Sequence, residues 1–334
     1  MTKYKAIIDA DGIAFTCAAA GEKRSIVVTH KNTLEQWSFS NRTEFWGTKR
    51  SKDGGKLADM NILRDSPYTW DEFTITDVQT VEPIENILHS TKLTFQRWLD
   101  ALQTNKYKAF IGGDTNFRVE RSTLLKYKGD RDQMIKPISL AQVQDYLISK
   151  FKAEVTDGIE ADDAVIIEAF GKKDHVVQTF DKDAYGQPVL VLNMTRPEEG
   201  IVNGNQFGKL WLNDKKEVRG IGRMFLYWQT LNGDSSDQYK ANCFSQLKWA
   251  DMAAYNHLKD ATNDKEALEK IISGFKLLYP EPQKVIGWRD DKIEIDWLYV
   301  AQEMFTMARM KKKVDEPEIL LTDVFDKLGV EYDK

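Results

Sequence analysis

The sequence predicts an α/β fold in which helices flank a mostly parallel central sheet. The first observation is a set of short apolar runs with the length of buried strands, at residues 4–9, 107–112, 176–180 and 188–194. The second is that helical segments separate these runs, as expected when parallel strands are joined by helical crossovers. The third is that aspartate follows three of the runs, at the strand ends where such sheets bind ligands.

Local patterns predict the elements between these strands. Helices are expected at residues 13–20, 83–102 and 140–150, from residue 161, from residue 223 and through most of the last third of the chain. A capping-box pair, Ser139 and Gln142, marks the start of the third of these helices. Residues 24–40 predict a β-hairpin, and the polar, glycine-bearing stretch 47–66 predicts a loop.

Composition excludes several classes of protein. A chain of 334 residues with 42% hydrophobic content can bury a sizeable core, as one large domain or two smaller ones. It contains no apolar run of roughly 18 residues and no apolar N-terminal stretch, so neither a membrane span nor a secretory signal is expected. The two cysteines, Cys17 and Cys243, lie far apart, which favours a reducing cytosol. The net charge of −5 argues mildly against nucleic-acid binding, although an average hides local patches.

Acidic side chains gather at the predicted ends of strands and helices. Five segments contribute ten carboxylates: Asp9, Asp11, Asp114, Glu160, Asp162, Asp163, Asp181, Asp183, Asp234 and Asp237. If these ends converge, repulsion and desolvation raise the pKa of each carboxyl group, and bound divalent cations relieve that cost. Because no histidine or cysteine joins the pattern, Mg²⁺ fits better than zinc, and Mn²⁺ can substitute. Two ions about 3.5–4 Å apart suit phosphoryl transfer. Each motif alone is also compatible with a turn or a helix cap.

A basic segment lies between the second predicted strand and the Glu160 group. Within residues 117–132, FRVERSTLLKYKGDRD, the candidate nucleic-acid contacts are Arg118, Arg121, Lys126, Tyr127, Lys128 and Arg131. Cations can follow a phosphate backbone while an aromatic face stacks on a base, as in single-strand binding. The alternative is an exposed segment with ordinary solvated charges. The aromatic and basic residues of 24–56 are equally compatible with an auxiliary nucleic-acid surface and with a small packed hairpin.

The order of these motifs resembles the 5′ nucleases of the flap endonuclease class, and in particular the phage 5′→3′ exonucleases. The matching motifs are IIDADG, GGDTNFR with KYKGDRD, GIEADDAV, TFDKDA and LNGDSSD, which span residues 6–237. The resemblance implies a PIN-like core, a helical arch and hydrolysis to 5′-phosphate and 3′-hydroxyl products. The chain departs from the family by lacking a glycine-rich helix-hairpin-helix turn after the last aspartate pair.

The resemblance also implies a role for each matching residue. The ion nearer the scissile phosphate is served by Asp9, Asp114, Glu160 and Asp162, with Asp163 close by. This set is bridged or completed by Asp181 and Asp183, and a second ion is served by Asp234 and Asp237. A looser match is Asp11. The catalytic residues on the arch that contact the scissile phosphate are Lys128 and Arg131. The residue implied to stack on a base is Tyr127.

The expected organisation is a catalytic domain over residues 1–240 and a helical DNA-binding region over 241–334. The catalytic domain carries an inserted hairpin and loop at about 24–80 and the arch at about 115–150. The expected substrates are DNA 5′ ends, flaps and nicks, together with RNA–DNA hybrids, in DNA replication or primer removal. We expect a monomer in the cytoplasm, or in the host-cell cytoplasm if a phage encodes it, in contact with replication proteins and not with a membrane.

Three alternatives stand beside this expectation. A PIN-like ribonuclease shares the acidic α/β core, but the KYKGDRD segment and the late Asp234–Asp237 pair favour the 5′ nuclease. A catalytically silent protein that binds branched DNA has little reason to keep so costly an acidic set. A calcium-buffering protein is disfavoured because the sequence contains no EF-hand loop.

Overall fold

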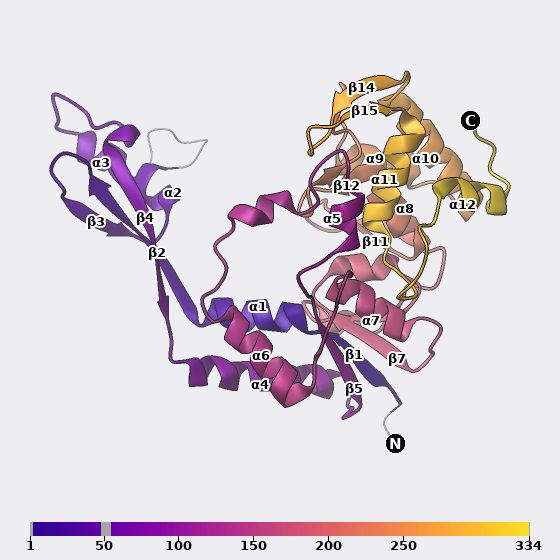
Figure 1. The fold of residues 1–334 in the computed structure, drawn as a ribbon, viewed down its shortest axis with the longest axis horizontal. Coiled ribbons are helices and arrows are strands. Elements are labelled where there is room, and N and C mark those ends of the chain that lie inside the picture. The colour runs from indigo at the N-terminus through magenta and orange to yellow at the C-terminus, as the bar shows by residue number, and fades with distance from the viewer. Residues whose placement is uncertain (1–2, 48–54, 334) are drawn as a thin grey trace. The chain divides into compact units, whose positions relative to one another are not determined.

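The structure is a computed structural model that describes residues 3–47 and 55–333 (Figure 1). Contacts divide the chain into two compact units. The first is built from Met1–Ile13, Thr94–Ile135 and Tyr146–Lys334, and the second from Ala14–Leu93 and Lys136–Asp145. Three of the four boundaries fall inside helices, which are α1 (Ala10–Ala20), α4 (Ile84–Ala101) and α6 (Leu140–Phe151), and the fourth lies between Ile135 and Lys136. The compact units therefore do not follow the expected division at residue 240.

The first unit contains a six-stranded sheet in the order β6-β5-β1-β7-β8-β9. Its strands are β1 (Lys5–Asp9), β5 (Tyr107–Ile111), β6 (Glu154–Val155), β7 (His175–Thr179), β8 (Leu190–Asn193) and β9 (Val202–Asn203). Every neighbouring pair is parallel except β8 and β9. The central strands β1 and β7 are almost wholly buried, which explains their apolar residues, although β7 also buries the polar Gln178 and Thr179. The mostly parallel α/β fold and the four predicted strands are confirmed.

Helices extend the core of the first unit to the end of the chain. They are α5 (Phe117–Arg121), α7 (Ala161–Ala169), α8 (Arg223–Asn232), α9 (Asp251–Leu258), α10 (Asp264–Leu278), α11 (Trp297–Ala308) and α12 (Leu321–Leu328). Helix α7 packs on β1 and β7, while α8 packs against α10 and α11 (Figure 1). One buried cluster runs from Ile7 on β1 to Val330 after α12. Residues 241–334 are mainly helical, as expected, but they share this core and do not form a unit of their own.

Short elements complete the first unit. They are the 3-10 helices η2 (Gly129–Gln133), η3 (Lys182–Gly186) and η4 (Pro197–Glu199), with the strand pairs β10 (Lys209–Leu212) and β11 (Val218–Ile221), β12 (Gly233–Asp234) and β13 (Tyr239–Lys240), and β14 (Gln283–Ile286) and β15 (Lys292–Ile295). The expected helical arch over 115–150 contains α5, η2 and α6, joined by irregular backbone. A continuous helical arch is therefore not what the described residues form.

The second unit is built around a three-stranded antiparallel sheet in the order β3-β2-β4. Its elements are β2 (Glu22–His30), β3 (Gln36–Phe39), α2 (Arg42–Trp46), α3 (Lys56–Asn61), η1 (Trp70–Glu72) and β4 (Phe73–Val81). The side chains that close its small core are Ile26, Val28, Phe45 and Phe73. The hairpin of residues 24–40 is confirmed, whereas β4 and α3 were not expected. Part of the predicted loop, residues 48–54, lies outside the described residues.

Candidate active site

Two aspartates meet where β1 and β7 end. Asp9 is the last residue of β1, and Asp181 caps η3 directly after β7. The two strands are parallel neighbours, with Ile8 opposite Gln178, so their carboxyl ends lie at one edge of the sheet. Thr179 Oγ1 donates to Asp9 Oδ2 at 2.9 Å. Asp183 follows in η3, where its backbone N–H donates to Asp181 Oδ1 at 2.8 Å. The strand order thus assembles the first three carboxylates.

The fourth carboxylate comes from the start of α7. Glu160 caps this helix and forms a reciprocal capping box with Asp163, which fixes where the first turn begins. Because α7 packs on β1 and β7, Asp162 in that turn comes close to Asp9 and Asp181, and their charges act on its pKa. We call Asp9, Asp162, Asp181 and Asp183 the carboxylate cluster.

Burial is the main reason why the pKa values of the carboxylate cluster are raised. It raises the pKa of Asp9 to about 7, assisted by the charges of Asp11 and Asp181. It also raises the pKa of Asp162 well above the usual range, with Asp9 and Asp181 as the next causes. The pKa of Asp181 and that of Asp183 are raised for the same first reason. Asp183 Oδ1 is buried and has no hydrogen-bond partner among the described residues. The negative charge of the cluster is therefore poorly compensated.

Three further carboxylates at the edge of the cluster are already paired with cations or hydroxyl groups. Glu160 accepts from Arg118 Nη1 at 2.9 Å and from Lys128 Nζ. Burial raises the pKa of Glu160, but Arg118 and Lys128 together hold it below its usual range. Asp237 accepts from Arg131 Nη2 at 2.6 Å. Asp234 accepts from Ser236 Oγ at 2.5 Å, and Lys182 Nζ lies 3.7 Å away.

A tight turn delivers the two predicted catalytic cations to these edge carboxylates. Lys128 has a positive φ of 54°, a left-handed conformation that costs a non-glycine residue on the order of 1 kcal/mol. Its backbone N–H donates to the carbonyl of Asp237 at 2.9 Å, which anchors the turn. Lys128 Nζ contacts Glu160 and lies 3.8 Å from Asp237 Oδ2. Arg131 keeps half of its side chain exposed. Both cations therefore lie beside the carboxylates, although neither is on a long helix.

Tyr127 does not present a stacking face. Its ring is 4% exposed and lies 6.3 Å from the ring of Tyr239. Its hydroxyl donates to Glu160 Oε2 at 3.0 Å and to Asp237 Oδ2 at 2.8 Å. In this conformation Tyr127 is buried and leaves little surface for a base, so its stacking role stays a prediction from the sequence. The residue links two edge carboxylates.

Arg118 is the second residue whose environment differs from the expectation. It is 2% exposed and donates to both oxygens of Asp163, at 2.6 and 3.1 Å. It also donates to the carbonyls of Met307 and Arg309, each at 3.0 Å. A buried guanidinium with this many partners is not placed to contact a nucleic-acid backbone. Asp163 is fully buried, and its carboxylate is paired with Arg118.

The remaining predicted residues lie at the periphery. Arg121 is exposed and donates to Glu318 at 2.5 Å, and Lys126 pairs with Asp132. Asp114 is exposed on the loop after β5, and no hydrogen bond or ion pair joins it to the cluster among the described residues. Asp11 Oδ2 accepts from the backbone N–H of Gly112 at 2.8 Å, so it joins the ends of β1 and β5. The structure thus brings together eight of the predicted acids, with Asp11 beside Asp9, and leaves Asp114 and Asp163 outside the shared space.

The donor chemistry of the carboxylate cluster fits a hard divalent cation. It offers only oxygen atoms, including Asp183 Oδ1, which has no hydrogen-bond partner among the described residues. A dication would offset both the burial and the mutual repulsion that raise the pKa values of these carboxyl groups. The described residues nevertheless include no group of three His, Cys, Asp or Glu side chains already arranged as an ion site. The cluster therefore matches a divalent cation in charge and in donor type, and its carboxylates would have to move closer to one another to bind the ion.

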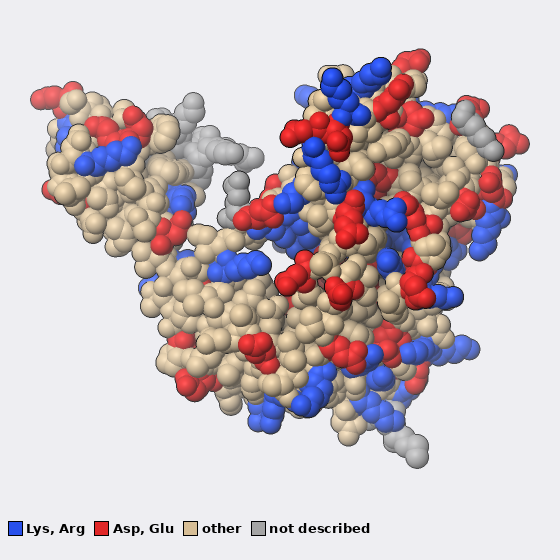
Figure 2. All heavy atoms as spheres, in the orientation of Figure 1, with Lys and Arg blue, Asp and Glu red and all other residues tan. Residues whose placement is uncertain are grey.

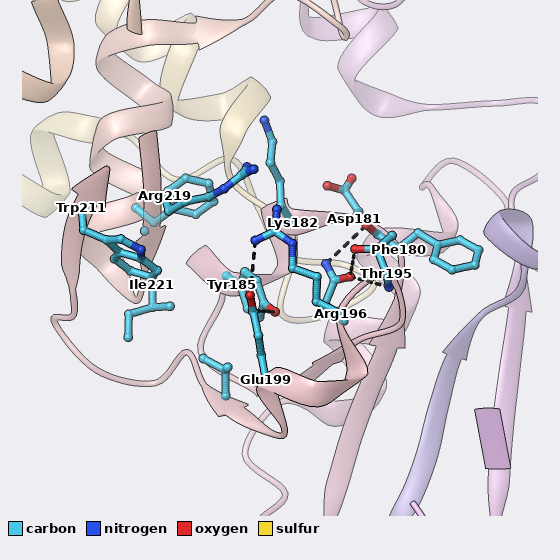
Figure 3. Close-up of a pocket in the computed structure, with 14 residues that line it drawn as sticks. Phe180, Asp181, Lys182, Tyr185, Thr195, Arg196, Glu199, Trp211, Arg219 and Ile221 are labelled. Atoms are coloured by element: carbon cyan, nitrogen blue, oxygen red, sulfur yellow. Dashed lines mark hydrogen bonds and ion pairs between the residues drawn. The ribbon is translucent and has the colours of Figure 1, made fainter. Parts of the chain in front are cut away.

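A cavity of about 500 Å³ beside Asp181 was not foreseen (Figure 3). Its lining includes Lys182, Arg196, Trp211 and Arg219. The sequence did contain a signal for this lining, because alternating residues of a hairpin share a face. Lys209 and Trp211 alternate before a short polar turn, and Arg219 follows it. On the visible surface of the first unit, basic and acidic side chains are interspersed (Figure 2), so the net negative charge does not mark a single acidic face there.

Comparisons with known proteins found similarity only among solved structures, one of which is described here. No family model and no curated protein matches the chain. The crystal structure of the T5 D15 protein co-crystallised with metal ions aligns with a TM-score of 0.37 at 16% identity, covering 67% of this chain and 79% of that one. A similarity of this strength does not establish a shared function.

Proposed function

We propose that this chain is a divalent-metal-dependent 5′ nuclease that hydrolyses phosphodiester bonds. The observation that carries the proposal is the carboxylate cluster, in which four acids from three separate segments crowd together. Asp9 is buried, the other three are half-buried, and none of the four forms an ion pair among the described residues. Removing an uncompensated charge from water costs on the order of several kcal/mol per group. A cluster of this kind does not stabilise the fold, so it points to a bound cation and to chemistry. The preference for 5′ ends rests on the motif order of the sequence.

The residues around the cluster have separable roles in this proposal. Asp9, Asp162, Asp181 and Asp183 hold the first ion, and Glu160, Asp234 and Asp237 serve a second. Magnesium bound there supplies a more acidic water and neutralises charge on the phosphoryl oxygens, and manganese suits the same donors. Asp163 acts through Arg118, by fixing the start of α7. The role of Asp114 stays a prediction from the sequence.

Lys128 and Arg131 are the groups that meet the scissile phosphate. Each is now paired with an edge carboxylate, and the Arg131 side chain is 50% exposed. Exposed ion pairs contribute only about 0–1 kcal/mol, so Arg131 can exchange its partner for a phosphate at little cost. Cations placed there stabilise the charge that develops on the phosphate during cleavage. The expected products carry a 5′-phosphate and a 3′-hydroxyl.

The test is cleavage of 5′-labelled single-stranded, nicked, flapped and RNA–DNA hybrid substrates with Mg²⁺ or with EDTA. We expect Mg²⁺-dependent cleavage that Asp162→Asn reduces on the order of a thousandfold or more, because it removes a carboxylate from the cluster. The matched control is Asp260→Asn, an exposed aspartate after α9, which should cleave like the wild type. Cleavage that persists in EDTA, or in Asp162→Asn, would overturn the proposal. Cleavage of RNA alone would identify a ribonuclease instead.

A further inference from the structure

The hairpin of β10 and β11 has one apolar face and one face that carries basic and aromatic side chains. Trp211 pairs directly with Arg219, and Lys209 pairs with Ile221, so these four side chains lie on the same face. On the other face, Leu210 and Val218 are 9% and 7% exposed and belong to the main core. The core contacts hold the hairpin in place and leave an aromatic ring beside a guanidinium on the free face.

That free face lines the cavity beside Asp181. The opposite wall comes from η3 and from the segment after β8, which contribute Lys182, Tyr185 and Arg196 (Figure 3). In Figure 3, Arg219 and Lys182 extend towards the same space, with the Asp181 carboxylate next to Lys182. A volume of about 500 Å³ lies within the range of roughly 300–1,000 Å³ typical of small-molecule sites.

The charges around the cavity favour an anion. Three cations and two carboxylates, Asp181 and Glu199, line it, so cations are in excess by one. Arg196 pairs with Glu199 at 3.3 Å, and Arg219 pairs with Glu217 at 2.6 Å. Arg219 Nε is buried and has no hydrogen-bond partner among the described residues. A buried N–H donor without an acceptor is unfavourable, and a ligand oxygen would satisfy it. Trp211 remains 38% exposed, so part of its ring is accessible.

We propose that this cavity binds one nucleotide of the substrate strand, with its base on Trp211 and its phosphate held by Arg219 and Lys182. The inference rests on the proposed function and names a substrate subsite for it. Because Asp181 belongs to both the cavity and the carboxylate cluster, the bound nucleotide is adjacent to the bond that is cleaved. Stacking on an aromatic ring accepts any base, so this subsite orders the strand without reading its sequence.

The experiment measures binding of deoxyadenosine monophosphate to the full chain in EDTA, by titration calorimetry or saturation-transfer NMR. We expect Trp211→Ala and Arg219→Ala each to weaken binding on the order of tenfold, the size expected for loss of one stacking or charged contact. Deoxyadenosine, which lacks the phosphate, should be sensitive to Trp211→Ala only. Deoxyribose 5-phosphate, which lacks the base, should be sensitive to Arg219→Ala only. Trp211→Phe keeps an aromatic face and should restore binding.

The matched control is Trp70→Ala, which removes a 69% exposed tryptophan from the second unit and should bind like the wild type. Equal binding of the monophosphate by the wild type, Trp211→Ala and Arg219→Ala would overturn the pocket. If those variants also cleave DNA normally, the nuclease proposal stands without the pocket. If the wild type binds the monophosphate but cleaves no substrate, and both variants bind the monophosphate more weakly, the pocket stands and the nuclease proposal fails.

Discussion

Asp162 and Asp163 are identical neighbours in the sequence, yet their carboxylates have different surroundings. Asp162 faces Asp9 and Asp181 and has a strongly raised pKa, with burial as the first cause. Asp163 accepts hydrogen bonds from Nη1 and Nη2 of Arg118 and from the backbone N–H of Lys311. Successive side chains on a helix point about 100° apart, so one turn can serve two environments. The motif EADD therefore combines a carboxylate that lies beside other carboxylates with one that is paired with an arginine.

Lys128→Ala tests whether this lysine acts on the transition state. We expect the cleavage rate at saturating DNA to fall on the order of a hundredfold, with the Kd for DNA changed by about threefold or less. The physical reason is that Lys128 Nζ lies beside Glu160 and Asp237, whereas most of its side chain is covered. Single-turnover cleavage and filter binding measure the two quantities.

Lys126→Ala is the matched control, since Lys126 belongs to the same segment but pairs with Asp132 away from the carboxylates. It should leave the cleavage rate unchanged. If Lys128→Ala lowers only the affinity for DNA, then the lysine positions the strand and has no part in the chemical step.

The raised pKa of Asp9 predicts how the stability of the metal-free protein depends on pH. Burial, followed by the charge of Asp11, raises its pKa from 3.8 to about 7, so the folded state holds the proton more tightly than the unfolded state. Its contribution to stability is fully present below about pH 4 and is lost as pH rises through about 7. In EDTA, we expect the free energy of unfolding in urea to be lower at pH 8 than at pH 5.

Two comparisons isolate this effect. Asp9→Asn cannot ionise and should reduce the difference between pH 5 and pH 8. Saturating Mg²⁺ should restore stability at pH 8, because an ion that binds only the folded state stabilises it. A metal-free protein that is more stable at pH 8 than at pH 5 would show that the cluster is compensated in some other way.

At the scale of elements, the short helix α5 uses its two arginines in different ways. Arg118 links α7 to the segment after α11, whereas Arg121 remains exposed beside Glu318. The residues that follow are also tied to α11, because Glu303 accepts from the backbone N–H groups of Thr123 and Leu124 at 3.1 and 3.0 Å. These contacts hold the base of the segment that carries Lys128.

Arg118→Met should lower the free energy of unfolding by about 3–5 kcal/mol, because it leaves Asp163 buried without its partner. Arg121→Met should change it by about 0–1 kcal/mol, because it removes an exposed pair. Urea unfolding of the two variants provides the comparison. Normal stability of Arg118→Met together with weaker DNA binding would restore the nucleic-acid role expected from the sequence.

At the scale of the whole molecule, the chain forms two compact units with separate buried clusters. The cluster of the first unit spans β1 to the residues after α12, while that of the second contains Ile26, Val28, Phe45 and Phe73. The candidate active site and the proposed nucleotide pocket both belong to the first unit. Stability of the second unit should therefore be separable from the catalytic core.

Phe45→Ala tests this separation, since Phe45 is fully buried in the second unit. Removing a buried phenylalanine costs about 3–5 kcal/mol, which is large for so small a core. Hydrogen exchange measured by mass spectrometry should become faster in β2, β3 and β4 and stay unchanged in β1 and β7. Equally faster exchange in both sets of strands would show that the two units unfold as one.

The sequence by itself determined four strands of the central sheet, the hairpin of residues 24–40, most of the helices and the acids at the strand ends. Buried strands must be apolar along their own length, and Asp9 and Asp181 follow such strands directly, so their positions are locally encoded. The parallel order of β1 and β7 then implies that these two acids meet. Fold class and the centre of the candidate site could both be predicted for this reason.

Only the tertiary structure decided which charged residues are buried, which are paired and where the cavity forms. Arg118 receives a partner 189 positions away, and Tyr127 bonds to Asp237 at a separation of 110. No local pattern encodes such contacts, because a side chain's partners depend on how distant elements pack. The same reason explains why residues 241–334 joined the main core and why Trp211 and Arg219 came to line a cavity beside Asp181.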